Sequence, residues 1–334
     1  MNKLNKLSRP FFVLAPMDDV TDTVFRQIIA DCAPPELYFT EFVNVDGLQS
    51  PGRQNLLKKL KFTDKETPLI AQIWGKNPEN YYKTVKELKD GTLAKEANNG
   101  DAKTNYIGVD INMGCPVKTV IKSGCCSALI DNRGLAGEII AAAKEAAGDL
   151  PVSVKTRIGI KNIDLSWFEF LLEQKLNMLT IHGRTQKEMS KVPAHWDVIG
   201  QCREIRDSLS PTTLIVGNGD VMSRKQGEKL AEQYKLDGIM IGRGVFHDPY
   251  MFENISGNQS TWELLTKKDK LSLYTKHVKL FADTWLDAER KIATLNKFCK
   301  IYVNDFPAAK ELREKLMNAS TINQLLHLIE KENS

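Results

Sequence analysis

Short apolar segments recur along the first three quarters of the chain, and longer stretches with helical character separate them. Eight of these segments are rich in residues that favour β-strands, and their apolar positions run continuously. Continuous apolar runs are typical of parallel strands that are buried on both faces. The eight runs span residues 11–16, 37–42, 68–75, 106–114, 151–159, 178–184, 213–220 and 238–244.

Helix signals fill the intervals between these runs. Residues 77–90 open with an Asn cap followed by Pro78, residues 132–147 are rich in Ala and Glu, and residues 223–233 open with a Ser cap. Strands that alternate with helices imply parallel βαβ units, and eight units in about 245 residues match a (β/α)₈ TIM barrel. A doubly wound open sheet is the competing architecture, but no GxGxxG motif follows the first predicted strand.

The last quarter of the chain has a different character. Residues 254–260 have turn chemistry, and residues 261–332 show helical periodicity with many Lys and Glu. We therefore expect a barrel domain over residues 1–254 and a small helical domain over residues 255–334. The 334 residues are 42% hydrophobic and 26% charged, as in ordinary globular proteins. This composition excludes dominant disorder and the collagen, coiled-coil and disulfide-scaffold classes.

Charge and cysteine content bear on possible partners, metal sites and the cellular compartment. The net charge of +4 is too mild to diagnose nucleic-acid binding. The six cysteines form no CxxC pair, so no structural zinc site is expected, and a reducing compartment fits best. The apolar run at residues 11–16 is too short for a secretory signal, and no stretch reaches the ~18 apolar residues of a membrane span. We expect a soluble, cytoplasmic protein without a metal.

Chemistry in such a barrel belongs at the carboxyl ends of the strands. Cys115 lies there between Gly114 and Pro116, where a thiol can act as a nucleophile or a proton donor; the alternative is a small buried apolar residue. Lys155 lies inside a predicted strand, where a lysine needs a partner or a function. It is a Schiff-base lysine, a cation set against an anionic cofactor, or the partner of a carboxylate such as Asp110.

The last two predicted strands both end in glycine-rich turns, at residues Asn218–Asp220 and Gly242–Gly244. Glycines let the backbone approach an anion closely, and Arg243 offers a charged fork, so the two turns together favour a phosphate site over ordinary tight turns. His182, at another strand end, is a cofactor partner, an acid or a histidine whose bonds are satisfied within the protein.

Seven segments, in order along nearly the whole barrel, resemble the tRNA-dihydrouridine synthase family. They are APMDDVTDTVFR (15–26), PLIAQIWG (68–75), GVDINMGCPVKTVIKSG (108–124), VKTRIG (154–159), TIHGRT (180–185), VGNGDV (216–221) and DGIMIGRGVFHDPYMF (237–252). The resemblance implies a barrel that binds FMN and a helical domain that binds tRNA. It also implies reduction of the C5=C6 bond of selected uridines, with NADPH as the reductant of the flavin.

The same resemblance implies roles for individual residues. Cys115 falls at the family's catalytic cysteine and would give a proton to uracil C5. The flavin would be lined by Pro16, Met17 and Asp18, its ring bonded by Gln72, Lys155 and His182, and its phosphate held by Asn218, Gly219, Asp220, Gly242 and Arg243. Asn112 and Arg184 would face the uracil or the flavin edge.

Two loops depart from the family pattern. Residues 124–127 read Gly-Cys-Cys-Ser, so Cys126 stands in a turn that is glycine-rich in many members, and residues 186–195 lack the usual Arg and Tyr. Three other functions compete with the synthase. They are an FMN barrel acting on a free pyrimidine, an RNA-binding barrel that has lost catalysis, and a Schiff-base aldolase.

Overall fold

The chain divides into two units, each described here by itself. The computed structural model describes residues 3–255, 259–285 and 289–333. The first unit comprises Met1–Thr23 and Pro35–Gly242, and the second comprises Val24–Pro34 and Arg243–Ser334. Part of the predicted turn at residues 254–260 lies outside the described residues. The domain boundary expected there stays a prediction.

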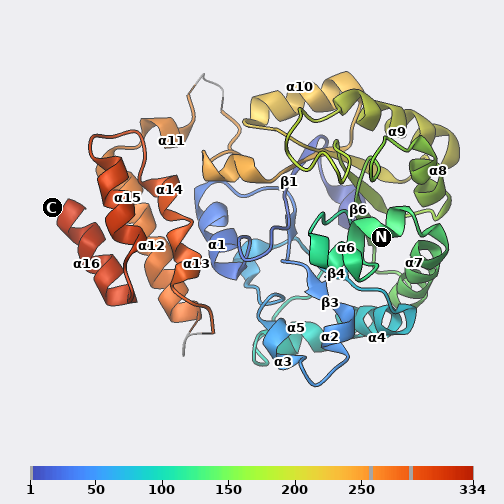
Figure 1. Ribbon diagram of the computed structural model, residues 1–334, viewed down its shortest axis with the longest axis horizontal. Helices are drawn as coiled ribbons and strands as arrows, with labels where there is room; N and C mark the ends of the chain where they lie inside the picture. Colours follow the sequence, from blue (N-terminus) through green and yellow to red (C-terminus); the bar gives the residue numbers. More distant parts are fainter. Residues whose placement is uncertain (1–2, 256–258, 286–288, 334) are drawn as a thin grey trace. The chain divides into compact units, whose positions relative to one another are not determined.

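All eight predicted runs form strands of one parallel sheet in the first unit (Figure 1). The strands are β1 (Phe11–Leu14), β2 (Tyr38–Phe39), β3 (Val43–Asn44), β4 (Leu69–Trp74), β5 (Gly108–Met113), β6 (Val152–Arg157), β7 (Met178–His182), β8 (Leu214–Asn218) and β9 (Gly238–Ile241). The sheet order is β1-β9-β8-β7-β6-β5-β4-β2, and β3 also pairs with β4. A parallel bridge joins Val13 of β1 to Leu37, directly before β2, so the two ends of this sheet order meet. The closed sheet confirms the barrel over the open sheet.

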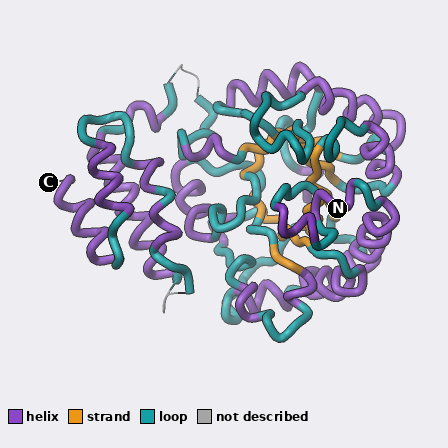
Figure 2. Tube along the Cα trace, in the orientation of Figure 1, coloured by secondary structure: helices purple, strands orange, loops and turns teal. Residues whose placement is uncertain are grey.

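Helices surround these strands in the first unit (Figure 2). They are α2 (Val45–Leu48), α3 (Gln54–Leu57), α4 (Pro78–Lys89), α5 (Thr92–Ala97), α6 (Lys118–Lys122), α7 (Arg133–Ala147), α8 (Leu165–Glu173), α9 (Trp196–Leu209) and α10 (Arg224–Tyr234). The predicted Asn and Ser caps are confirmed: the side chain of Asn77 accepts from the Glu79 N–H at 2.9 Å, and that of Ser223 from the Gln226 N–H at 3.1 Å. Each cap satisfies a backbone donor that the helix leaves unpaired.

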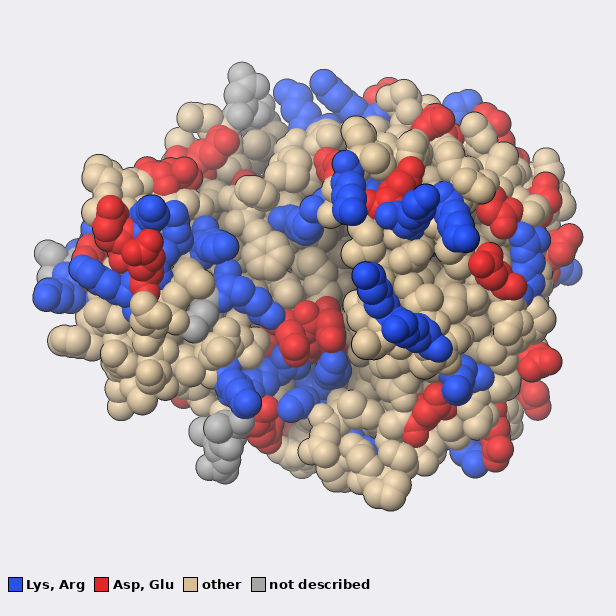
Figure 3. Space-filling view, in the orientation of Figure 1, with Lys and Arg blue, Asp and Glu red and all other residues tan. Residues whose placement is uncertain are grey.

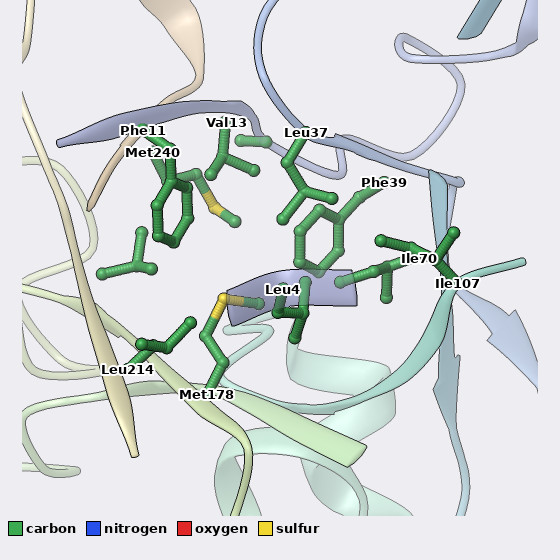
Figure 4. Close-up of a cluster of buried hydrophobic side chains, with 12 residues drawn as sticks. Leu4, Phe11, Val13, Leu37, Phe39, Ile70, Ile107, Met178, Leu214 and Met240 are labelled. Atoms are coloured by element: carbon green, nitrogen blue, oxygen red, sulfur yellow. The ribbon is translucent and has the colours of Figure 1, made fainter. Parts of the chain in front are cut away.

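The barrel interior is apolar at one end. A short 3₁₀ helix, η1 (Lys3–Lys6), places Leu4 among buried side chains of the strands, and Figure 4 shows it between Met178 and Ile70. Side chains alternate along a strand, so residues two positions apart share a face. Ile70 is therefore followed on the inner face by Gln72, and Val216 by Asn218. The interior changes from apolar to polar toward the carboxyl ends of the strands.

The second unit is helical. It contains most of α1 (Thr23–Cys32), the 3₁₀ helix η4 (Arg243–Phe246), α11 (Thr261–Leu264), α12 (Lys267–Thr284), α13 (Ala293–Asn296), α14 (Cys299–Tyr302), α15 (Ala309–Met317) and α16 (Ile322–Asn333). The rings of Phe25 and Phe298 lie 4.9 Å apart, and the Nδ1 atom of His277 lies 2.8 Å from the Tyr302 hydroxyl. Aromatic packing thus joins α1 to the C-terminal helices. Among the described residues, no helix has the length and hydropathy needed to cross a membrane.

Candidate active site

Strand register brings the predicted polar residues into rows. Gln72 of β4 pairs with Asp110 of β5, which pairs with Ser153 of β6. One step further along, Asn112 pairs with Lys155. Neighbouring strands are ~4.8 Å apart, so residues in register touch side by side. The sheet alone therefore assembles three predicted site residues from three separate sequence segments.

Hydrogen bonds fix the first of these rows. The Gln72 amide donates to one oxygen of Asp110 at 2.7 Å, and the Ser153 hydroxyl donates to the other at 2.6 Å. The Asn112 amide donates to the Gln72 carbonyl oxygen at 3.1 Å. Burial raises the pKa of Asp110 to about 6, although both hydrogen bonds and the charge of Lys155 act to lower it. The network holds the Gln72 amide in one orientation.

Lys155 is a partly buried cation in the barrel mouth. Its Nζ donates to the Asn218 side-chain oxygen at 3.3 Å, and the Asn218 amide donates to the Met240 carbonyl at 2.8 Å. Burial lowers the Lys155 pKa to about 8, Arg157 adds to the lowering, and Asp110 opposes it. The ammonium is therefore mostly charged at pH 7. Lys155 and Asn218, predicted for the ring and the phosphate of one cofactor, are in direct contact.

Arg184 links the ends of β7 and β8. It is 2% exposed, forms an ion pair with Asp220, and its Nη1 lies 3.2 Å from His182 Nε2. Its Nε donates to the Val192 carbonyl at 2.6 Å, and the Ala194 N–H donates to Asp220 at 3.0 Å. Three predicted site residues thus form one cluster, which also holds the loop that departs from the family pattern.

Cys115 lies in the turn that follows β5, and several bonds fix that turn. The N–H groups of Gly114 and Cys115 both donate to the Asn112 side-chain oxygen, at 3.1 and 3.0 Å. The Ser127 hydroxyl donates to the Cys115 carbonyl at 2.9 Å, and Arg157 Nε donates to the Gly114 carbonyl at 2.8 Å. The thiol is partly exposed. A fixed, accessible thiol at a strand end is suited to proton transfer.

Cys126 is the neighbour that tunes this thiol. It begins the 3₁₀ helix η3 (Cys126–Ile130) and is fully buried. A hydrogen bond with Cys126, aided by the Val117 N–H and the charge of Arg157, lowers the pKa of Cys115 to about 7 against the effect of burial. Burial and the same contact raise the pKa of Cys126. The sequence predicts no chemical role for Cys126, and its only signal is its place in a turn that is glycine-rich in many members of the family that the chain resembles.

Comparison with known proteins decides the family. The model of the dihydrouridine synthase family matches residues 13–333. The chain belongs to this family. It is 43% identical over 333 residues to a probable tRNA-dihydrouridine synthase of Staphylococcus aureus (strain COL), a match that spans 99% of this chain and 95% of the relative. It is 42% identical over 332 residues to probable tRNA-dihydrouridine synthase 2 of Bacillus subtilis (strain 168), spanning 98% and 96%.

The fold has a remote likeness among solved structures. Histamine dehydrogenase from Rhizobium sp. 4-9 superposes with a TM-score of 0.51 at 13% identity, over 80% of this chain and 48% of that longer one. This likeness supports the barrel fold. A dihydrouridine synthase is an oxidoreductase, so the expected enzyme class is confirmed by the family match.

The remaining predicted residues of this dihydrouridine synthase follow β1 and β9. Pro16 and Met17 are partly buried after β1, and a Cβ on Gly242 would lie 3.7 Å from Met17 Sδ. Asp18 is exposed and forms an ion pair with Lys59. Met17 and Gly242 are therefore neighbours, as the resemblance requires of residues lining one ligand.

Two observations bear on charge near these residues. Carboxylate oxygens of Asp18, Asp19 and Glu41 all lie within 4.8 Å of one another, and the Asp19 N–H donates to Glu41 at 2.7 Å. The Lys59 ammonium supplies a positive charge to this group. Arg243 is exposed and begins η4 in the second unit, so its phosphate role stays a prediction.

Proposed function

We propose that this dihydrouridine synthase reduces the C5=C6 bond of specific uridines in tRNA to 5,6-dihydrouridine, with FMN as cofactor and NADPH as reductant. One observation carries the proposal beyond the family match. The partly exposed Cys115 thiol and the Lys155 cation lie at the same carboxyl edge of the barrel, on the neighbouring strands β5 and β6 or just after them. A proton donor and a fixed cation at one site are what reduction of a ring double bond requires.

The inner face of the barrel fits a flavin in its chemistry. Thr180 Oγ1 is buried with no hydrogen-bond partner among the described residues, and Gly242 presents no side chain beside Met17. Buried polar atoms are normally paired, so Thr180 calls for a ligand or water. Bound FMN, reduced by NADPH, would supply the hydride that adds to uracil C6. Lys155 would hold the flavin ring by its positive charge, and Gln72 would hold it by hydrogen bonds from its side-chain amide.

The protein itself would supply the second hydrogen of the reduction, as a proton. The Cys115 thiol donates its proton to uracil C5 and is left as a thiolate, which regains a proton from solvent. Its pKa of about 7 suits transfer near neutral pH, because a donor works best when its pKa is close to the working pH. Asn112 keeps the turn in place through its two backbone bonds. Arg184 would face the uracil or the flavin edge.

The helical region is proposed to bind tRNA. The target uridine must leave its stack to reach the barrel, so the protein grips folded RNA by backbone and shape. Lysines of this region could contact RNA phosphates: Lys279 and Lys300 are exposed, whereas Lys276 pairs with Asp31 at 2.8 Å. On the face seen in Figure 3, basic side chains of this unit are interspersed with acidic ones. A tRNA substrate and the free thiols of the described residues fit the reducing cytoplasm.

The test is mass spectrometry of unmodified tRNA incubated with the purified protein and NADPH. We expect a gain of two hydrogens on a uridine, and the digestion fragment gives its position. Cys115→Ala should keep bound flavin and lose most of the reduction. Cys202→Ala, at a buried cysteine of α9, is the matched control and should keep both. No gain on tRNA, but reduction of a free pyrimidine, would refute the tRNA assignment; normal turnover by Cys115→Ala would refute the proton donor.

A further inference from the structure

Two cysteine side chains meet at the proposed active site. Cys115 follows β5, Cys126 begins η3, and their thiols are joined by a hydrogen bond. The Ser127 hydroxyl bonds the Cys115 carbonyl at 2.9 Å, so backbone and side chain both tie η3 to the turn. One thiol is partly exposed and the other is fully buried. An accessible cysteine beside a protected second one is the usual layout of a redox-sensing pair.

The backbone at Cys126 makes this pairing notable. Its φ is +54°, in the left-handed region that favours glycine. A cysteine at this position adopts a strained backbone that glycine would adopt without strain, and its thiol makes the hydrogen bond with Cys115. Its neighbour Cys125 is buried too, but its sulfur lies 3.9 Å from the Ser123 carbonyl. The hydrogen bond between the thiols of Cys115 and Cys126 therefore selects Cys126 as the partner.

We propose that Cys115 and Cys126 form a reversible intramolecular disulfide when the enzyme meets a two-electron oxidant such as hydrogen peroxide. The Cys115 thiolate attacks one peroxide oxygen, the O–O bond breaks, and Cys115 becomes a sulfenic acid while water leaves. The Cys126 sulfur then attacks the Cys115 sulfur, the S–O bond breaks, and a second water leaves. Two thiols are oxidised to one disulfide and one peroxide is reduced to two waters. Two equivalents of a small thiol reverse the change by exchange.

The consequence for catalysis rests on the proposed function. A disulfide leaves Cys115 without a proton, so the oxidised enzyme should not complete reduction of uridine. The disulfide also protects Cys115, because a sulfenic acid without a partner thiol is oxidised further to sulfinic acid, which small thiols do not restore. Three other cysteines are poor targets, because burial raises the thiol pKa of Cys32 to about 12 and also raises those of Cys202 and Cys299, which leaves little thiolate.

The experiment uses the purified full chain and hydrogen peroxide, followed by blocking of free thiols and mass spectrometry. We expect one linked peptide pair containing Cys115 and Cys126, lighter by two hydrogens, which dithiothreitol removes. Cys125→Ser is the matched control and should give the same linked pair. Cys126→Gly suits the left-handed backbone and guards against misfolding; here Cys115 should gain two oxygens, and dithiothreitol should not restore it.

Three results would overturn the proposed disulfide between Cys115 and Cys126. They are oxygen gain on Cys115 of the unmodified chain without a linked peptide, a link to Cys125 instead, or full recovery of Cys126→Gly by dithiothreitol. The mass readout needs no tRNA, so failures can be told apart. A disulfide that forms while tRNA reduction continues supports the pair and refutes Cys115 as proton donor. Reduction of tRNA by an enzyme that forms no disulfide refutes the pair and leaves the proposed function standing.

Discussion

Replacement of Cys126 by glycine should raise the pKa of the Cys115 thiol. The variant removes the largest influence that lowers this pKa and leaves the Val117 N–H and the charge of Arg157 in place. Hydrogen bonds to charged groups contribute about 1.5–3 kcal/mol, and S–H is a weak donor, so the lower end applies. Since one pKa unit corresponds to ~1.4 kcal/mol, the shift is about one unit, from about 7 to about 8.

The assay is alkylation of Cys115 by iodoacetamide across a pH series, followed by peptide mass spectrometry. Only the thiolate reacts, so the rate follows its fraction. At pH 7 that fraction should fall from about one half to about one tenth, a roughly fivefold slower reaction. Circular dichroism and flavin content check that the variant folds. A midpoint that stays near 7, or moves down, would refute the reasoning about Cys126.

The same variant tests the role of Cys115 in catalysis. A proton donor must be protonated, so activity falls as pH rises through its pKa. The basic limb of the tRNA-reduction profile should therefore move up by about one unit in Cys126→Gly, in step with the alkylation midpoint. A limb that does not move while the midpoint does would show that another group supplies the proton.

Three further changes test other parts of the site. Asn112→Ala should lower the free energy of unfolding, measured with urea, by about 2 kcal/mol, because two backbone N–H groups lose their acceptor. Asn112→Asp keeps an acceptor and should lower the free energy of unfolding less, so equal losses in the two variants would contradict this reasoning. Arg243→Ala should weaken FMN binding measured by fluorescence titration, and unchanged affinity would remove Arg243 from the phosphate site. Folding raises the pKa of Asp110 to about 6, so its buried charge costs stability as pH rises from about 4 to 6. Asp110→Asn should abolish that loss of about 3 kcal/mol. If the free energies of unfolding of the variant and the unmodified chain change with pH in parallel, this reasoning is refuted.

Local sequence signals predicted the fold well. Each of the eight apolar runs contains a strand, and α4, α7 and α10 lie where cap residues or an Ala- and Glu-rich composition predicted helices. Such features depend on a few adjacent residues, so they can be read from the chain. The second run, expected as one strand over residues 37–42, forms only the two-residue β2, and β3 begins after the run ends. The chain leaves the strand at Thr40, whose hydroxyl accepts the Gln72 N–H at 3.0 Å. That interruption depends on a contact between distant segments.

The convergence of several candidate site residues was predictable from their positions near the ends of parallel strands. Gln72, Lys155 and Asn218 come together because parallel register places strand ends at one edge. The charge partners were not predictable. Arg184 and Asp220 were assigned separate roles, and their ion pair follows from how two strand ends and the loop carrying Ala194 fold together.

The position of Cys115 relative to the barrel explains why its reactivity depends on loops. Cys115 lies beyond the end of β5 and is therefore not part of the sheet. Its N–H bonds the Asn112 side chain, and its carbonyl accepts from Ser127 of η3. Four residues that would hold the flavin belong to the sheet, whose register fixes them: Gln72, Lys155, His182 and Asn218. The thiol's pKa instead depends on η3, where Cys126 lies. A change at Cys126 can therefore alter the proposed proton transfer from Cys115 while the sheet residues keep their places.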